Sequence, residues 1–368
     1  MTFFDKRTVC VLNTIVLFAL MAGFLYGARR ILIVFLFAVL FAYLLEPLAS
    51  MVQRRSKFSR GSRSLAILQV YLILLLLIVG ILLSVGPRVA DEGRRLAAAL
   101  PSLLDQVSSG KIVAQFGGKH GWSFDTQTLV QQFFRTHREA IIGWASDFGR
   151  RATLLLTNTL WLIVIPILAI FFLRDGRGFA DSVIQIAERN RQRQLLSSIA
   201  EDLNLMLAGY IRAQLILAGL SLVVYTVVLL LLRVPYAIIL GLVGGAMEFI
   251  PFAGPLVAAL VIFGVAFLTG YHHLVLIALF LALWRLLQDY VSSPRIMGGK
   301  LQLHPLAALF AILAGGEIAG VIGIYLSIPI MAALRILWRR GKKYSETTDK
   351  MTQETQTAPK KGEVVRSL

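Results

Sequence analysis

The chain has 368 residues, of which 57% are hydrophobic and 15% are charged, and its mean hydropathy of +0.74 excludes a soluble globular protein. The formal net charge is +17, but the basic residues cluster beside apolar stretches, where they act as topology signals and contact anionic lipid. No nucleic-acid-binding module is visible, so we expect no nucleic-acid partner. The single cysteine, Cys10, excludes an internal disulfide and a multi-cysteine metal site.

The first region, residues 1–87, contains three predicted membrane spans. Their apolar stretches are Val9–Tyr26, Ile31–Leu48 and Leu65–Val85. The loop Gln53–Arg63 carries five basic residues and no acid, which places it in the cytoplasm. The N-terminus then lies on the cytoplasmic side as well.

A polar region follows the third span. Residues 88–151 are mixed in charge with amphipathic spacing, and we expect a pair of helices lying over the outer face of the membrane. Residues 152–210 hold a fourth span, Leu154–Leu173, and a basic cytoplasmic connector with a helix at about Gly178–Leu207.

Residues 211–340 form the predicted transport core. They contain two apolar stretches, Tyr236–Leu268 and Pro305–Trp338, each about 50 Å long as a straight helix against a hydrocarbon core of about 30 Å. Helix-breaking residues interrupt the stretches near their midpoints, at 250–255 and 315–320. Paired interrupted helices of this kind indicate the binding site of a transporter.

Two topologies fit the core. If each long stretch is one tilted span, the basic loop Ser292–His304 lies outside the cell; if each is a re-entrant hairpin, that loop lies in the cytoplasm. The hairpin topology fits the length of the two stretches and keeps the basic loop in the cytoplasm. It also makes an inverted repeat, in which span Ile211–Leu232 with the first hairpin corresponds to span Leu274–Val291 with the second. The predicted fold is therefore an all-α polytopic integral membrane protein with about eight membrane segments. The tail, residues 341–368, is expected to be cytoplasmic and disordered.

The interrupted stretches supply the candidate substrate or ion pathway. A break at membrane depth frees backbone groups that must line a cavity or be covered by protein, and a buried acid there often marks an ion or proton path. Plain kinks and locally paired acids are the structural alternatives. Of the two glutamates beside the breaks, Glu317 is expected to matter more, because the glycines around it admit backbone and water. The pathway candidates are Glu248, Pro251, Gly254, Pro255, Asp289, Gly315, Gly316, Glu317 and Gly320.

A second group of polar and turn residues has a predicted gating or structural role. Arg285 and Asp289 are four residues apart and can pair on one helix face. The five histidines lack metal-ligand spacing, and no nucleotide-binding or nucleophile motif is present, so we expect no metal, no cofactor and no enzymatic activity. The gate or pairing candidates are Arg212, Gln214, Arg285, Gln288, Pro294 and Arg295.

An ordered set of motifs runs along nearly the whole chain, up to about Arg340: Tyr43–Pro47, Phe172–Asp175, Tyr210–Gln214, Val234–Tyr236, Ile250–Pro255, Ser293–Gly298, His304-Pro305 and Gly315–Glu317. This set resembles the autoinducer-2 exporter family of bacterial membrane proteins. The resemblance implies about eight membrane segments and a permease; some members export the furanone autoinducer-2 and others are assigned sodium/proton antiport. Where the family often has Glu-Asn, this chain has Gln288-Asp289, an acid moved by about 100° around a helix.

The leading hypothesis is a secondary transporter in the bacterial inner membrane that exports a small polar solute, with autoinducer-2 as the candidate. A cation/proton antiporter that uses Glu248, Asp289 and Glu317 is the alternative. A membrane scaffold or sensor is a third hypothesis, in which residues 88–151 and the connector bind partners, but the broken helices argue against it. A homo-oligomer is compatible with all three.

Overall fold

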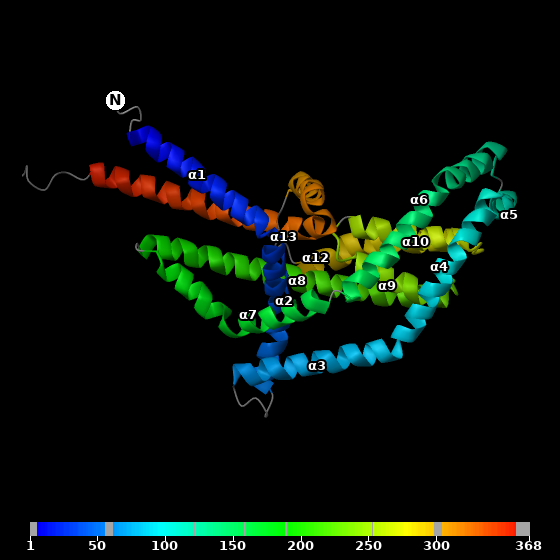
Figure 1. Cartoon of the computed structure of the whole chain (residues 1–368), viewed down its shortest axis with the longest axis horizontal. Helices are drawn as coiled ribbons and strands as arrows, with labels where there is room; N and C mark the ends of the chain where they lie inside the picture. The colour runs from blue at the N-terminus through cyan, green and yellow to red at the C-terminus, as the bar shows by residue number, and fades with distance from the viewer. Residues whose placement is uncertain are drawn as a thin grey trace, which may run out of the picture. The chain divides into compact units, whose positions relative to one another are not determined.

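The computed structural model describes residues 6–55, 62–120, 122–157, 159–187, 190–251, 253–297 and 304–357. Every regular element in these ranges is a helix, which confirms the all-α fold (Figure 1). The chain divides into two compact units: residues 1–80 with 145–177, and residues 81–144 with 178–368. Each unit is described by itself.

The first unit is built on three long helices. Helix α1 (Lys6–Gly27) leads into α2 (Arg29–Arg55), which packs with α3 (Arg63–Ser84) and α7 (Thr159–Gln185) around a small apolar core. Its buried residues are Ala42, Leu45, Ala49, Ile67, Val70, Ala169 and Leu173. Arg63 holds the three helices together at one end: its Nη2 lies 2.9 Å from Glu46 Oε2, and its Nε donates to the Leu173 carbonyl at 2.7 Å.

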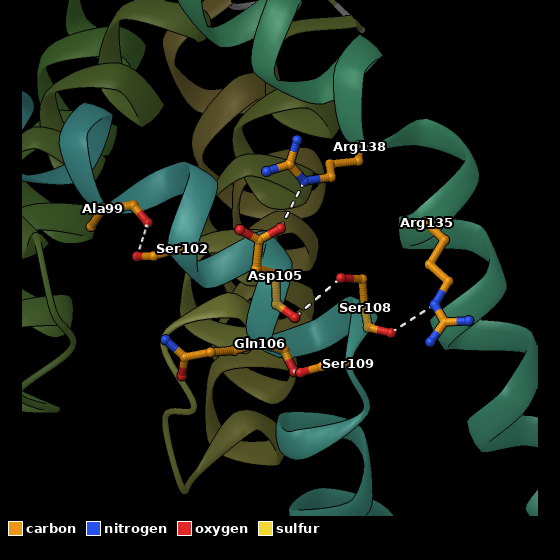
Figure 2. A network of polar contacts seen from close by, with 8 residues as sticks. All are labelled: Ala99, Ser102, Asp105, Gln106, Ser108, Ser109, Arg135 and Arg138. Carbon is orange, nitrogen blue, oxygen red and sulfur yellow. Dashed lines mark hydrogen bonds and ion pairs between the residues drawn. The ribbon is translucent and has the colours of Figure 1, made fainter.

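In the second unit, three helices make up the region in which the sequence predicted a pair. They are α4 (Gly86–Ser108), α5 (Lys111–His120) and α6 (Phe124–Thr157). Figure 2 shows how polar contacts join α4 to α6: Arg138 Nε lies 2.8 Å from Asp105 Oδ1, and Arg135 Nε donates to the Ser108 carbonyl at 2.8 Å. We call α4, α5 and residues 124–144 of α6 the outer layer.

The outer layer packs against two short apolar helices, α9 (Ala237–Met247) and α10 (Ala253–Leu268). Apolar side chains of α4 and α5 share a core with the end of α10, where Phe134 and Phe267 stack at 5.9 Å between ring centroids. At the start of α9, the Glu92 carboxylate accepts the backbone N–H groups of Ile238 and Ile239 at 3.1 and 3.0 Å. Such a carboxylate satisfies two of the N–H groups that every helix start leaves open.

The chain reverses between α9 and α10. The two helices pack on each other, and the Tyr271 hydroxyl, just after α10, donates to the Leu232 carbonyl, just before α9, at 2.5 Å. Both outer ends of this segment therefore lie together. Helix α9 packs directly on α8 (Asn190–Leu231), as Figure 1 shows. The approach is so close that a Cβ added at Gly241 would lie 2.7 Å from the Thr226 backbone. Of the connector helix predicted at Gly178–Leu207, the first residues belong to α7, and the part from Asn190 forms one continuous helix, α8, with the fifth predicted span.

A second reversal lies within α13 (Pro305–Thr357). Ala319 and Gly320 leave helical geometry, and Gly320 has φ 60° and ψ −139°, a region that glycine alone adopts readily. A Cβ at Gly315 would meet the Gly323 carbonyl carbon at 2.9 Å. Residues eight apart along a straight helix are about 12 Å apart, so this approach shows that the helix doubles back.

Three short elements connect the reversals. Helix α11 (Leu274–Leu287) continues into a π-helix, η1 (Gln288–Ser292), and then into α12 (Ser293–Met297). Most of the predicted cytoplasmic loop Ser292–His304 beyond α12 lies outside the described residues.

By length and composition, five described helices are apolar enough to cross a membrane, so the chain is a multi-pass membrane protein. A further three are apolar but shorter: Val11–Gly27, α9 and α10. The fourth predicted span, Leu154–Leu173, falls partly on residues whose side chains are not described. The five are Arg29–Arg55, Arg63–Ser84, Asn190–Leu231, Leu274–Ile296 and Leu306–Glu346.

The tail differs from the expectation of disorder. Helix α13 continues to Thr357, and Lys342 lies 3.9 Å from Glu346 one turn later. Lysine, glutamate, methionine and glutamine are good helix formers, so a helix that begins in an apolar segment can extend through a polar one. Residues 358–368 lie outside the described residues.

Candidate transport site

Glu248 directly follows the last residue of α9, and its side chain is buried, with 6% of the residue exposed. Gln288 Nε2, from η1, donates to Glu248 Oε1 at 2.8 Å and to Ser221 Oγ at 2.7 Å. The side-chain amide of Gln214 donates to the backbone carbonyl of Glu248. These four residues, which we call the Glu248 cluster, join α8, the first reversal and η1.

Several polar atoms of the cluster keep an open hydrogen-bonding position. The amide nitrogen of Gln288 has two hydrogens and both are used, whereas Gln288 Oε1 and Glu248 Oε2 have no partner among the described residues. The hydroxyl of Tyr210, one turn before Gln214, is also buried and unpartnered there. A buried polar atom without a partner costs about 1–3 kcal/mol. The cluster itself therefore offers two acceptor oxygens, Glu248 Oε2 and Gln288 Oε1, to a ligand.

The cluster is positioned by two antiparallel helices. Ser221 and Tyr225 are one turn apart on α8, and Trp284 and Gln288 are one turn apart on α11 and η1. Ser221 bonds to Gln288, and the rings of Tyr225 and Trp284 meet edge to face at 6.3 Å. The polar pair and the aromatic pair, one turn apart, together fix the register of the two helices.

Gln288 and Asp289 are neighbours at the start of the π-helix η1, but their side chains lie in different surroundings. Gln288 is buried against Glu248, whereas Asp289 Oδ2 lies 2.9 Å from Arg285 Nε, with side chains 46% and 41% exposed. The predicted pairing of Arg285 with Asp289 is confirmed. Asp289, a pathway candidate, is therefore not part of the cluster, and the neutral Gln288, a gate candidate, is. Single π-helical turns often occur at functional sites.

The breaking residues of the first reversal shape the turn beside Glu248. Gly254 is buried, and a Cβ there would collide with the Met247 carbonyl. Its N–H donates to the Ile250 carbonyl at 2.9 Å, and the next residue, Pro255, is buried in the first turn of α10. Pro251 is half-buried in the turn. These residues hold the reversal tight, and part of the freed backbone is satisfied locally.

The second reversal lacks a comparable cluster in the described residues. Gly315 packs against Gly323, and Ser327 Oγ donates to the Gly323 carbonyl at 2.6 Å. Gly316 lies against Ile324, and Gly320 forms the turn itself. Glu317 is exposed. The structure thus brings Glu248 together with Gln214 and Gln288, and leaves Glu317 apart.

The remaining gate candidates Arg212, Pro294 and Arg295 are exposed. Sequence reasoning missed Ser221 and Tyr210 as site residues. Tyr210 is four residues before Gln214 and Ser221 is seven after it on α8, so helical spacing from Gln214 could have found both. In the described residues, no group of three or more His, Cys, Asp or Glu side chains could hold a metal ion.

The sequence profile of the AI-2E family transporters matches residues 14–343, nearly the whole chain. The chain belongs to the AI-2E family. This confirms the resemblance inferred from the motifs.

Relatives of the chain carry names that agree with this family. It is 24% identical over 310 residues to "Putative transport protein YueF" of Bacillus subtilis, covering 82% of this chain and 81% of that protein. It is 24% identical over 306 residues to "Putative transport protein sll0063" of Synechocystis, covering 82% and 75%. A match to a third, YrrI of Bacillus subtilis, is 28% identical over 173 residues and spans only about half of either chain, 47% and 49%. Family and names together support a membrane transporter.

Proposed function

We propose that this AI-2E family member is a secondary transporter that exports a small polar solute through the Glu248 cluster. The observation that carries the proposal is the pair of buried, unpartnered oxygens, Glu248 Oε2 and Gln288 Oε1. An ionisable residue inside a membrane helix bundle is unfavourable unless it serves a substrate or ion path. A solute with hydroxyl groups donates to both oxygens and relieves their desolvation.

The proposed topology makes both reversals re-entrant hairpins and puts both termini in the cytoplasm. The hydrogen bond from Tyr271 to Leu232 supports entry and exit on one side for the first hairpin. The outer layer adds support, since it contacts the start of α9 through Glu92 and the end of α10 through Phe267. Helices α9 and α10 have 11 and 16 residues, about 17 and 24 Å, too short to cross a core of about 30 Å.

Autoinducer-2 is the candidate substrate. A small hydroxylated furanone has several O–H donors, which suit the two open acceptors, one on the Glu248 carboxylate and one on the Gln288 amide. The antiporter alternative was built on three acids. Of these acids, only Glu248 is buried among polar groups, because Asp289 pairs with Arg285 and Glu317 is exposed. This difference supports a neutral solute over proton-coupled cation exchange.

The test is solute flux in proteoliposomes, with autoinducer-2 and with sodium, with and without an imposed pH gradient. Glu248→Gln keeps the size of the side chain but replaces one open acceptor by a donor, so we expect autoinducer-2 flux to fall at least about tenfold. Glu317→Gln is the matched control at the other reversal and should retain flux. Unchanged flux in the Glu248→Gln protein would refute the role of the cluster. Sodium flux coupled to protons, without autoinducer-2 flux, would favour the antiporter.

A further inference from the structure

A cavity of about 190 Å³ lies between the polar first part of α8 and the last part of α13. The side chains around it include three cations and no acid. This volume is below the roughly 300 Å³ at which pockets for drug-sized ligands begin, so it suits a small group. The cavity is lined by Arg191, Gln194, Leu195, Ser198, Arg340, Lys343 and Tyr344.

The lining comes from one face of each helix. On α8 the residues are spaced by three, four and seven from Arg191, and on α13 Lys343 and Tyr344 follow Arg340 by three and four. Such spacing puts the side chains of each helix on a single face, so the two faces confront each other across the cavity. The positive charge is therefore a product of helix packing and not of a flexible basic tail.

Two contacts hold the walls together. Asp202, one turn beyond Ser198 on α8, lies 2.7 Å from Arg340 Nε and 3.1 Å from Arg339 Nη2. The guanidinium of Arg191 lies 4.7 Å from the centre of the Tyr344 ring, and its Nη2 donates to the Tyr344 carbonyl at 3.3 Å. Arg340 is bound to Asp202 through Nε, and the two terminal nitrogens of its guanidinium are spaced to bind a phosphate in a bidentate manner.

The cavity lies next to the membrane boundary. The apolar part of α13 ends at Trp338, which is 77% exposed, and tryptophan is enriched at the level of lipid headgroups. Arg340 and Tyr344 follow within six residues, about 9 Å along the helix. The group that reaches this cavity can therefore belong to a lipid or to a soluble molecule.

We propose that this cavity is a binding site for a phosphate monoester or diphosphate group, separate from the Glu248 cluster. Arg191, Arg340 and Lys343 neutralise its charge, and the amide of Gln194 donates a further hydrogen bond. By joining α8 to α13, the bound group stabilises the packing of the two helices that carry the cluster and the second reversal.

The test uses the purified full-length protein in detergent with three probes: short-chain phosphatidic acid, inorganic pyrophosphate and short-chain phosphatidylcholine. Affinity is measured by titration, and the stabilisation of the fold by thermal unfolding. The variants are Arg191→Gln and Lys343→Gln, with Lys342→Gln as the control. Lys342 is adjacent to Lys343 and has the same charge, but it does not line the cavity.

We expect phosphatidic acid or pyrophosphate to bind, phosphatidylcholine to bind weakly, and each cavity variant to lose about tenfold in affinity, as for one charge-assisted hydrogen bond. Lys342→Gln should bind as the unmodified protein does. Tighter binding of phosphatidic acid identifies a lipid headgroup as the source, and equal or tighter binding of pyrophosphate identifies a soluble phosphate. Failure of both anionic probes to bind, or equal weakening by Lys342→Gln and Lys343→Gln, would overturn the proposal.

Discussion

The two helix reversals begin from the same sequence pattern and end in different surroundings. Each is an overlong apolar stretch with glycines or prolines at its centre and one glutamate beside the break. At the first, Glu248 is buried by α8 and η1 and bonded to Gln288; at the second, Glu317 is exposed. A break in a helix therefore does not by itself make a site. The proposed site lies where other helices bring amides and a hydroxyl to the break.

The largest expected effect is a loss of stability on replacing a glycine at a reversal, and it should be greater at Gly254 than at Gly320. Gly254→Ala puts a methyl group against the Met247 carbonyl, which is backbone and cannot move aside, so we expect a loss of about 3 kcal/mol. Gly320→Ala meets no atom within 4 Å but retains a φ of 60°, and should lose about 1–2 kcal/mol. Thermal unfolding of the two variants in detergent shows which substitution destabilises the protein more. The reverse order would mean that the tight turn at Gly254 relaxes.

The next comparison is between neighbours in η1. Gln288→Leu removes both hydrogen bonds and leaves the Glu248 carboxylate with no donor among the described residues, so we expect a loss of about 2 kcal/mol and of solute flux. Asp289→Asn breaks only a half-exposed ion pair and should cost less than about 1 kcal/mol, with flux retained. Unfolding and flux are measured on the same preparations. Equal losses of flux in both variants would place Asp289 in the pathway after all.

A smaller effect is expected where the outer layer meets α9. Glu92→Gln retains one acceptor oxygen but loses the negative charge at the helix start, so stability should fall by about 1 kcal/mol. Asp91→Asn, the adjacent acid, is the control. Hydrogen exchange of the amides of Ile238 and Ile239 reports the local effect. Unchanged protection there would show that the carboxylate does not cap α9 in the membrane.

The smallest effect concerns pH. Hydrogen bonds from Arg340, and then from Arg339, hold the pKa of the Asp202 carboxyl below its ordinary value. A carboxyl whose folded pKa is lowered contributes stability above its unfolded pKa, and loses it as pH falls through the folded value. We expect the melting temperature to fall below about pH 4, and less so in Asp202→Asn. If the melting temperature falls equally with pH in the unmodified protein and in Asp202→Asn, groups other than Asp202 cause the acid sensitivity.

Much of the fold follows from length and hydrophobicity. The apolar stretches, their two interruptions and the spacing of Arg285 and Asp289 are local, and the structure contains the corresponding helices, reversals and ion pair. The sequence predicted only part of the candidate site. Helical spacing places Asp289 and Gln288 about 100° apart, but which of them faces Glu248 depends on the π-turn and on the packing of α8 against α11. The polar tail was expected to be disordered because composition alone does not show that α13 continues into it.

The hydrogen bonds from α9 to Glu92 also constrain how the protein is made. Ile238 is 146 residues beyond Glu92, so α4 leaves the ribosome long before the helix that it caps. Until Phe267 and Leu268 follow, the buried face of α4 that contains Leu104 and Val107 has no partner from α10. Contacts so distant in sequence form slowly, and an amphipathic helix can meanwhile shelter its apolar face in the membrane surface. We therefore expect the lipid interface to cover the apolar face of α4 during synthesis, until α10 is made.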